Sequence, residues 1–209
     1  MRLLGPGDFQ RMPWKNGLGV TVQIAIAPPG ASVENFDWRV STAGVAASGP
    51  FSAFADIDRS LVVLRGGPMR LVMRAPDATH EAVLDADSAP CRFGGDWPTQ
   101  AELLGSDEVV DFNVMTRRGR FDHRLLRLDI DAPTPVAGAL VLVYCVRGEL
   151  SCRDMLAAAA RPATLVAGAA LLVQANAGDR GGVRLQLDPG ATGPARILVV
   201  HLLANGASS

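Results

Sequence analysis

Residues 36–41 read FDWRVS and alternate strictly between apolar and polar side chains. An alternation of period two predicts a β-strand with one apolar face and an opposite face that carries Arg39 and Ser41. Residues 110–114, VDFNV, repeat the pattern, with an acid and an amide opposite three apolar side chains. These two stretches predict neighbouring or similar strands, each with a polar face that has to meet either solvent or a cavity.

The same pattern of short runs extends along the chain, separated by Gly, Pro and Asp. Strands are predicted at residues 20–26, 36–41, 61–64, 69–73, 110–114, 124–128, 140–146, 149–153, 165–174, 183–187 and 196–203. Helical periodicity is weak, and residues 154–160 could supply only a turn or two before Pro162 stops them. The sequence therefore predicts an all-β protein with little helix.

A faint internal repeat divides the chain. In each half a strand that ends at glycine precedes a short strand: residues 61–66 before 69–73, and residues 140–148 before 149–153. Two similar antiparallel barrels or sandwiches are therefore predicted, because closing or packing sheets removes exposed edges. We expect domains at residues 1–119 and 120–209, with an N-terminal strand that could cross between the halves.

The overall composition excludes several classes of protein. The 209 residues are 48% hydrophobic and 20% charged, with a net charge of −1, which disfavours disorder and a polyanionic partner. The basic cluster at residues 116–120, TRRGR, is too short for a nucleic-acid footprint. No apolar run approaches the roughly 20 residues of a membrane helix. Cys91, Cys145 and Cys152 form no CxxC pair, so we expect a soluble, cytoplasmic protein with reduced thiols.

The usual motifs of metal and nucleotide chemistry are missing. The three histidines, His80, His123 and His201, form no His-x-His pair. The sequence has no Gly-x-Ser-x-Gly elbow, no P-loop, and no GxGxxG after a strand. We therefore expect neither a metal nor another cofactor.

A polar set in the first half remains. It consists of Lys15, Asn16, Arg39, Ser41, Arg59, Asp96, Asp111 and Asn113. Its cations would suit a carboxylate ligand, since a guanidinium binds a carboxylate through two hydrogen bonds and stays charged when desolvated. The same residues could instead form ion pairs that staple loops. The segment Trp14-Lys15-Asn16-Gly17, just before the strand at 20–26, is either a plain turn or the rim of a site.

Four stretches of the first half resemble the HutD/Ves family of bacterial bicupins, which is associated with histidine utilisation. They are MPWKNGLGVTVQIA (12–25), FDWRVSTAGVAASGPFSAFADIDRSLVVLRGG (36–67), RFGGDWP (92–98) and VDFNVMTRRG (110–119). The second half is similar only as a loosely related cupin. The resemblance implies a cupin-like jelly-roll β-barrel for each half, with the polar faces turned into the first barrel.

The resemblance also implies which residues bind a ligand. They are Trp14, Lys15, Asn16 and Gly17 at the mouth, then Arg39, Ser41, Ser52, Arg59, Asp96, Asp111 and Asn113 around the cavity. Arg59 lies seven residues before Gly66, where a metal-binding cupin would carry a glutamate ligand, so a cation replaces a metal ligand. Leu18 and Ala55-Asp56 depart from the family pattern, which has glycine at the first position and a Pro-Gly turn at the second.

These residues support three functional hypotheses. The first is metal-independent binding of a small acidic metabolite, of the N-formylglutamate or urocanate class, that regulates histidine utilisation. The second is a metal-independent isomerase or hydrolase with Asp96 or Asp111 as acid or base, although carboxylates beside arginines usually have depressed pKa values. The third is an interaction module, with a homodimer as one possible assembly.

Overall fold

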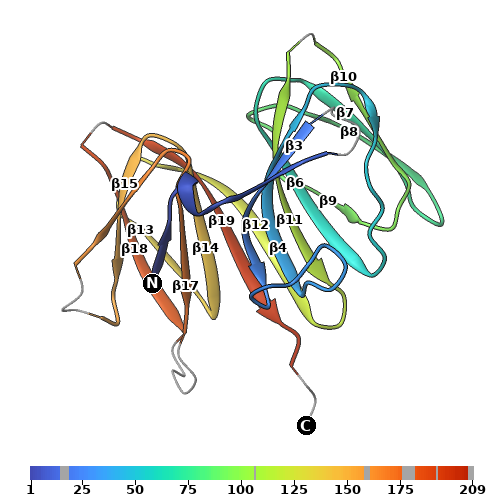
Figure 1. The fold of residues 1–209 in the computed structure, drawn as a ribbon. Helices are drawn as coiled ribbons and strands as arrows, with labels where there is room; N and C mark the ends of the chain where they lie inside the picture. Colours follow the sequence, from blue (N-terminus) through green and yellow to red (C-terminus); the bar gives the residue numbers. More distant parts are fainter. Residues whose placement is uncertain (15–18, 106, 158–160, 176–181, 192, 207–209) are drawn as a thin grey trace. The chain divides into compact units, whose positions relative to one another are not determined.

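The computed structural model describes residues 1–14, 19–105, 107–157, 161–175, 182–191 and 193–206 (Figure 1). The chain forms two compact units. The N-terminal unit comprises Phe9–Asp122 with the last residues from Asn205, and the C-terminal unit comprises Met1–Asp8 and His123–Ala204. The first eight residues thus belong to the C-terminal unit, and the main boundary between the two units lies between Asp122 and His123.

Two antiparallel sheets build the N-terminal unit. The six-stranded sheet has the order β2 (Gln10–Pro13), β3 (Gly19–Ala27), β4 (Trp38–Val45), β11 (Val109–Arg117), β6 (Ile57–Arg65) and β9 (Cys91–Gly94). The four-stranded sheet has the order β5 (Gly49–Pro50), β10 (Thr99–Leu103), β7 (Met69–Arg74) and β8 (Thr79–Leu84).

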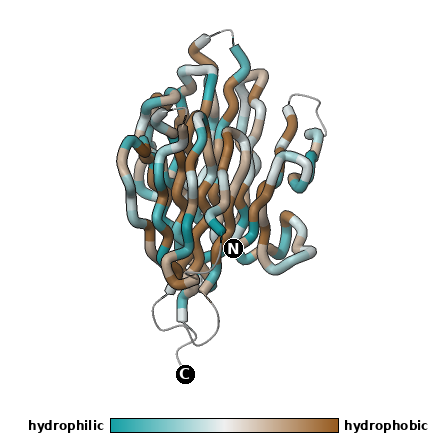
Figure 2. Tube along the Cα trace, turned by 90° about the vertical axis from the view of Figure 1, so that its left-hand side faces the viewer, coloured by the Kyte–Doolittle hydropathy of each residue, from teal (hydrophilic) through white to brown (hydrophobic). Residues whose placement is uncertain are grey.

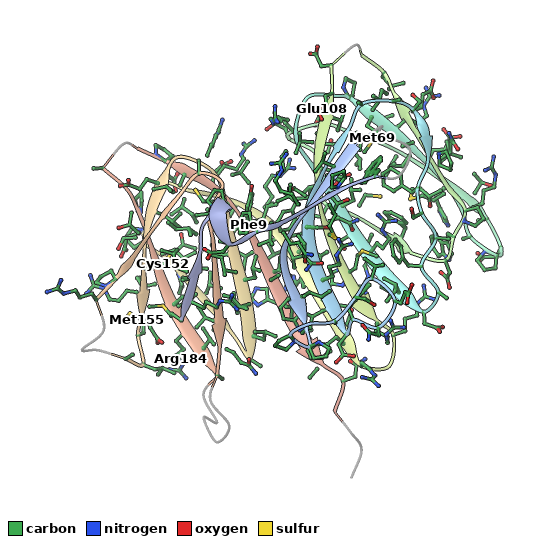
Figure 3. All side chains as sticks on the ribbon, viewed as in Figure 1. Phe9, Met69, Glu108, Cys152, Met155 and Arg184 are labelled. Atoms are coloured by element: carbon green, nitrogen blue, oxygen red, sulfur yellow. The ribbon has the colours of Figure 1, made fainter. Side chains whose placement is uncertain are left out.

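A hydrophobic cluster joins these two sheets. Leu61 and Val63 of β6 pack in one cluster with Met69 and Leu71 of β7 and Phe93 of β9, and all five are buried. Met69 is labelled on β7 in Figure 3. The side of the six-stranded sheet that carries Leu61 and Val63 is therefore its inner face.

Two further antiparallel sheets build the C-terminal unit. The five-stranded sheet has the order β1 (Arg2–Leu4), β17 (Ala170–Gln174), β14 (Leu140–Arg147), β19 (Ala195–Ala204) and β12 (Phe121–Ile130). The four-stranded sheet has the order β13 (Thr134–Gly138), β18 (Val183–Pro189), β15 (Glu149–Asp154) and β16 (Ala163–Val166). The expected crossing of an N-terminal strand is confirmed, because β1 pairs with β17.

The interior of the C-terminal unit is filled with aliphatic side chains and thiols. Val143 of β14 and Val199 of β19 pack against Leu150 and Cys152 of β15 and Leu187 of β18, all buried. Figure 3 labels Cys152 on β15, and Figure 2 shows the hydrophobic residues interspersed with hydrophilic ones along the strands. This alternation is what the period-two pattern predicts for strands that bury one side.

The all-β prediction is confirmed, with local differences from the expected strands. The stretch 165–174 is two strands, β16 and β17, because Gly168 takes a positive φ of 84° and turns the chain from one sheet into the other. The stretch 61–64 belongs to a longer β6 that also contains Arg59. In the part of the chain that the structure describes, the only helix is the 3₁₀ turn η1 (Pro6–Asp8), and no helix there is long and apolar enough to cross a membrane.

Candidate functional site

A cavity of about 660 Å³ lies in the N-terminal unit against the inner face of the six-stranded sheet. Its charged lining comes from the strands, and the segment at residues 47–54 supplies much of its apolar lining together with Ser48 and Ser52. The lining consists of Met12, Pro13, Trp14, Thr21, Val33, Arg39, Ser41, Ala43, Val45, Ala47, Ser48, Gly49, Pro50, Phe51, Ser52, Phe54, Arg59, Asp111, Asn113 and Met115.

Strand register places two arginines on the same row of this face. Met115 of β11 stands opposite Arg39 of β4 on one side and Arg59 of β6 on the other. Two strand spacings of about 4.8 Å put the Cα atoms of the arginines about 10 Å apart. Both side chains are buried, each with 5% of its surface exposed. The inner face therefore carries two buried guanidinium groups within reach of one small ligand.

The next positions along β11 add an amide and an acid. Asn113 stands opposite Ser41, and Asp111 stands opposite Ala43. Because side chains at i, i+2 and i+4 share one face, both point to the same side as Met115. The polar faces predicted for residues 36–41 and 110–114 thus line one cavity.

Aromatic rings surround Arg59. Its guanidinium carbon lies 5.1 Å from the ring centres of Phe51 and Phe93 and 5.8 Å from that of Phe54. Its Nη1 donates a hydrogen bond of 3.3 Å to the carbonyl oxygen of Ser52. Its Nε is buried, and no described residue accepts a hydrogen bond from it. This charged side chain thus keeps one donor unsatisfied by the residues that the structure describes.

Burial lowers the pKa of both arginines. Desolvation lowers the pKa of Arg59 to about 10, with Asp111 opposing this change and Arg39 adding to it. Desolvation also lowers the pKa of Arg39, whose Nε donates a hydrogen bond of 2.9 Å to Oε1 of Gln23. A pKa of about 10 keeps Arg59 protonated at neutral pH, so the cavity holds two positive charges from these residues.

Asp111 is the acidic group of the cavity, and its environment corrects our expectation of a depressed pKa. Burial raises the pKa of Asp111 to about 7, against the opposing effects of Arg59 and of the backbone of Ala43. Desolvation outweighs the neighbouring cation because only 2% of the residue is exposed. The Oδ1 atoms of Asp111 and Asn113 are buried and accept no hydrogen bond from any described residue.

One side of the predicted rim is described. Trp14 donates a hydrogen bond from Nε1 to Oγ1 of Thr21, at 2.8 Å, and its backbone N–H bonds to the carbonyl of Gly19. A Cβ at Gly19 would lie 2.9 Å from the Trp14 ring and would also meet the carbonyl oxygen of Gly44. Gly19 thus allows the indole to pack closely on the sheet. Lys15, Asn16 and Gly17, also predicted at the mouth, lie outside the described residues.

Asp96 is the described site candidate that the structure does not bring to the cavity. Its carboxylate is 41% exposed and forms a two-pronged ion pair with Arg118, at 2.6 Å and 3.0 Å. The hydrogen bonds to Arg118 lower the pKa of Asp96. Arg118 also donates to a carboxylate oxygen of Asp58, at 2.7 Å, and to the carbonyl of Ile57. Asp96 therefore belongs to an ion pair that ties two loops together, as the alternative interpretation of the polar residues predicted. Arg118, from the basic cluster at residues 116–120, is the cation of this pair.

The structure brings together the other described candidates. They are Trp14, Arg39, Ser41, Ser52, Arg59, Asp111 and Asn113. Asp56, one of the departures from the family pattern, takes a positive φ of 59° immediately before β6, so a turn still forms there and Arg59 enters the strand.

Sequence reasoning missed several groups around the cavity. Thr21 and Gln23 lie on the face of β3 opposite its apolar side chains. Thr21 accepts a hydrogen bond from Trp14, and Gln23 accepts one from Arg39. The alternation at residues 20–26 could have identified both. Phe51 and Phe54 lie in a segment without regular secondary structure, where periodicity carries no information about direction.

The donor set of the cavity does not fit a metal ion. Two buried guanidinium groups would repel a cation, while hard divalent ions take several oxygen ligands and transition metals take imidazole or thiolate. Across the described ranges, no group of three His, Cys, Asp or Glu side chains could hold a metal. The chemistry that fits is recognition of an anion.

Comparisons with known proteins agree on one family. Residues 7–192 match the HutD family profile. Protein Ves from Cronobacter sakazakii is 35% identical over 156 residues, which is 71% of this chain and 80% of that protein. An uncharacterised 21.2 kDa protein from the hutC 3′ region of Pseudomonas putida is 33% identical over 150 residues, 72% of this chain and 76% of that protein.

Solved structures extend the likeness to nearly the whole chain. HutD from Pseudomonas fluorescens SBW25, determined in a formate condition, has a TM-score of 0.76 and 27% identity, covering 98% of this chain and 99% of that one. A conserved protein of unknown function from Pseudomonas aeruginosa PAO1 has a TM-score of 0.82 and 30% identity, covering 96% and 97%. Oxalate decarboxylase from Lactobacillus farciminis shares only the fold, at 7% identity and a TM-score of 0.70, over 97% of this chain and 88% of that one.

The predicted cupin-like fold is therefore confirmed, with each unit formed by a pair of sheets rather than by one closed sheet. The match of the family profile to most of the chain, together with these relatives, shows that the chain belongs to the HutD family, which is associated with histidine utilisation.

Proposed function

We propose that this protein binds a small acidic metabolite of the N-formylglutamate or urocanate class in the cavity of its N-terminal unit, and that this binding regulates histidine utilisation. The observation that carries the proposal is the buried Arg59, whose Nε has no acceptor among the described residues, in one cavity with the buried Arg39. A carboxylate supplies the acceptors that such groups require.

The cavity suits a compact ligand. About 660 Å³ lies within the range typical of small-molecule sites, and apolar walls with a few converging polar groups are the usual composition of such sites. Phe51 and Phe54 pack beside the guanidinium of Arg59, and Ser52 accepts a hydrogen bond from it, so the ligand's carboxylate would bind a group that is already held in place.

Thermal unfolding with a panel of acids tests the proposal. The panel contains N-formylglutamate, urocanate and unrelated dicarboxylates, with a chelator present throughout. A ligand at about 100 times its dissociation constant adds roughly 2.7 kcal/mol to the free energy of unfolding. We expect a shift of the midpoint with one histidine-pathway acid. No shift with any acid, together with a concentration-dependent mass, would favour the interaction module, including a homodimer.

Replacing Arg39 tests the site itself. Arg39→Ala should weaken binding of the selected acid by about 2–5 kcal/mol, the usual cost of removing one partner of a buried charge pair. Arg70→Ala is the matched control, because Arg70 is exposed on β7 and pairs only with Glu102 among the described ion pairs. Titration calorimetry measures the dissociation constant of the acid for each variant. Equal affinities of the two variants would remove Arg39 from the site.

A second function is favoured by the state of Asp111. A carboxyl group whose pKa is about 7 can give and take protons at neutral pH, as an acid or base in an isomerase or hydrolase does. Turnover of a bound acid that is lost in Asp111→Asn, with binding retained, would establish this function. Asp96 is not a candidate for the role, because Arg118 lowers its pKa and holds it away from the cavity lining.

A further inference from the structure

The charged groups of the cavity come from three neighbouring strands. β4 contributes Arg39, β6 contributes Arg59 and β11 contributes Asp111. The described lining from β2, β3 and the segment at residues 47–54 carries no ionisable side chain. With Asp111 ionised, the described residues of the cavity carry a net charge of about +1, and with Asp111 protonated about +2.

These two states differ in the ligand charge that neutralises them. A monoanion neutralises the cavity when Asp111 is ionised. A dianion neutralises it only when Asp111 is protonated, because an ionised Asp111 would leave an uncompensated negative charge in a buried site.

Hydrogen bonding distinguishes the same two states. Oδ1 of Asp111 and Oδ1 of Asn113 accept no hydrogen bond from any residue that the structure describes, and a second carboxylate could not donate to either atom while Asp111 is ionised. A protonated Asp111 is a donor and can bond to that carboxylate. Asn113 Oδ1, which no described residue bonds to, could accept a hydrogen bond from an N–H group of the ligand. Burial raises the pKa of Asp111 to about 7, so the proton is available near neutral pH.

We propose, building on the proposed function, that the cavity binds a dicarboxylic acid together with one proton. One carboxylate of the ligand pairs with Arg59 and Arg39, and the other accepts a hydrogen bond from Asp111. The proton comes from solvent and forms an O–H bond with a carboxylate oxygen of Asp111, and no other covalent bond changes. A monocarboxylic acid of the same shape binds without this proton.

Titration calorimetry at pH 8, in two buffers with different heats of ionisation, counts the proton. The probes are N-formylglutamate, a dianion at this pH, and N-formylglutamine, in which an amide replaces one carboxylate. We expect uptake of about one proton with the dianion and close to none with the monoanion. The dissociation constant of the dianion should rise about tenfold per pH unit between pH 8 and 9, while that of the monoanion stays constant.

Two variants locate the proton. Asp111→Asn should bind the dianion with no proton uptake and no pH dependence. Asp129→Asn is the control, because it removes an exposed, ion-paired carboxylate of the C-terminal unit. Its binding of the dianion should keep both the proton uptake and the pH dependence. Dianion binding to the unmodified protein without proton uptake, or equal uptake with both probes, overturns the inference, as does uptake that persists in Asp111→Asn. Absence of binding by either probe and by the rest of the acid panel refutes the proposed function itself.

Discussion

Neutralising Asp111 should change how the stability of the unliganded N-terminal unit depends on pH. The folded pKa of Asp111 is raised from 3.8 to about 7, so the folded state binds more protons than the unfolded state between these values. Stability from this group is therefore present at low pH and lost as pH rises through 7. At pH 5, two units below the folded pKa, the group contributes about 2.7 kcal/mol, at about 1.36 kcal/mol per unit; at pH 8 it contributes almost nothing.

Asp111→Asn removes this titration while keeping the shape of the side chain. The free energy of unfolding of the natural protein, relative to Asp111→Asn, should fall by about 2–3 kcal/mol between pH 5 and pH 8. Subtracting the variant's curve removes the titration of every other group. Tryptophan fluorescence in a urea titration is a suitable assay, because all three tryptophans, at positions 14, 38 and 97, lie in the N-terminal unit. Parallel curves for the two proteins would refute the reasoning and indicate that Asp111 titrates far below neutrality.

Three further predictions test the packing of the units. Phe112→Ala should cost about 3–5 kcal/mol of unfolding free energy in the same fluorescence assay, because Phe112 is fully buried. Gly66→Ala should lower the free energy of unfolding more than Gly119→Ala. Both glycines have φ near +75°, but only at Gly66 would a Cβ meet backbone atoms, those of Glu108. Equal losses of unfolding free energy would contradict this account. Cys145 and Cys152, with pKa values raised to about 11 and 12 by burial, should resist alkylation until the C-terminal unit unfolds, and peptide mass spectrometry would detect early modification.

Periodicity predicted the shared faces of the site but not which face is the inner one. Arg39 and Ser41, and likewise Asp111 and Asn113, lie where strict alternation places them. Alternation alone favoured solvent over a cavity for the polar face, whereas in the structure the polar face lines the cavity and the opposite face of β11, at Phe112, is buried as well. The resemblance to the HutD family supplied that direction, because it came from residues in several segments at once.

Other parts of the site depend on depth and on loop paths, which a single sequence does not encode locally. Asp96 belongs to a turn after β9, where no repeating pattern indicates direction, and Arg118 captures it outside the cavity. The pKa of Asp111 depends on competition between desolvation and a nearby guanidinium, and the adjacent cation alone suggested the wrong sign. The rings around Arg59 come from two distant parts of the chain, the segment with Phe51 and Phe54 and strand β9 with Phe93, which only the folded structure brings together.

The two units of the chain provide an internal comparison for the cost of the cavity. The C-terminal unit fills the space between its sheets with aliphatic side chains such as Val143, Leu150 and Val199, so the architecture does not require polar groups inside. The N-terminal unit instead buries Arg39 and Arg59, and Nε of Arg59 bonds to no described residue, an arrangement that destabilises a folded domain unless a partner is present. Residues that break a packing rule followed elsewhere in the same chain are expected where function requires them. An anion that pairs with these arginines would offset the free-energy cost of burying their charge. The N-terminal unit should therefore be the part of the protein whose stability responds most to ligand.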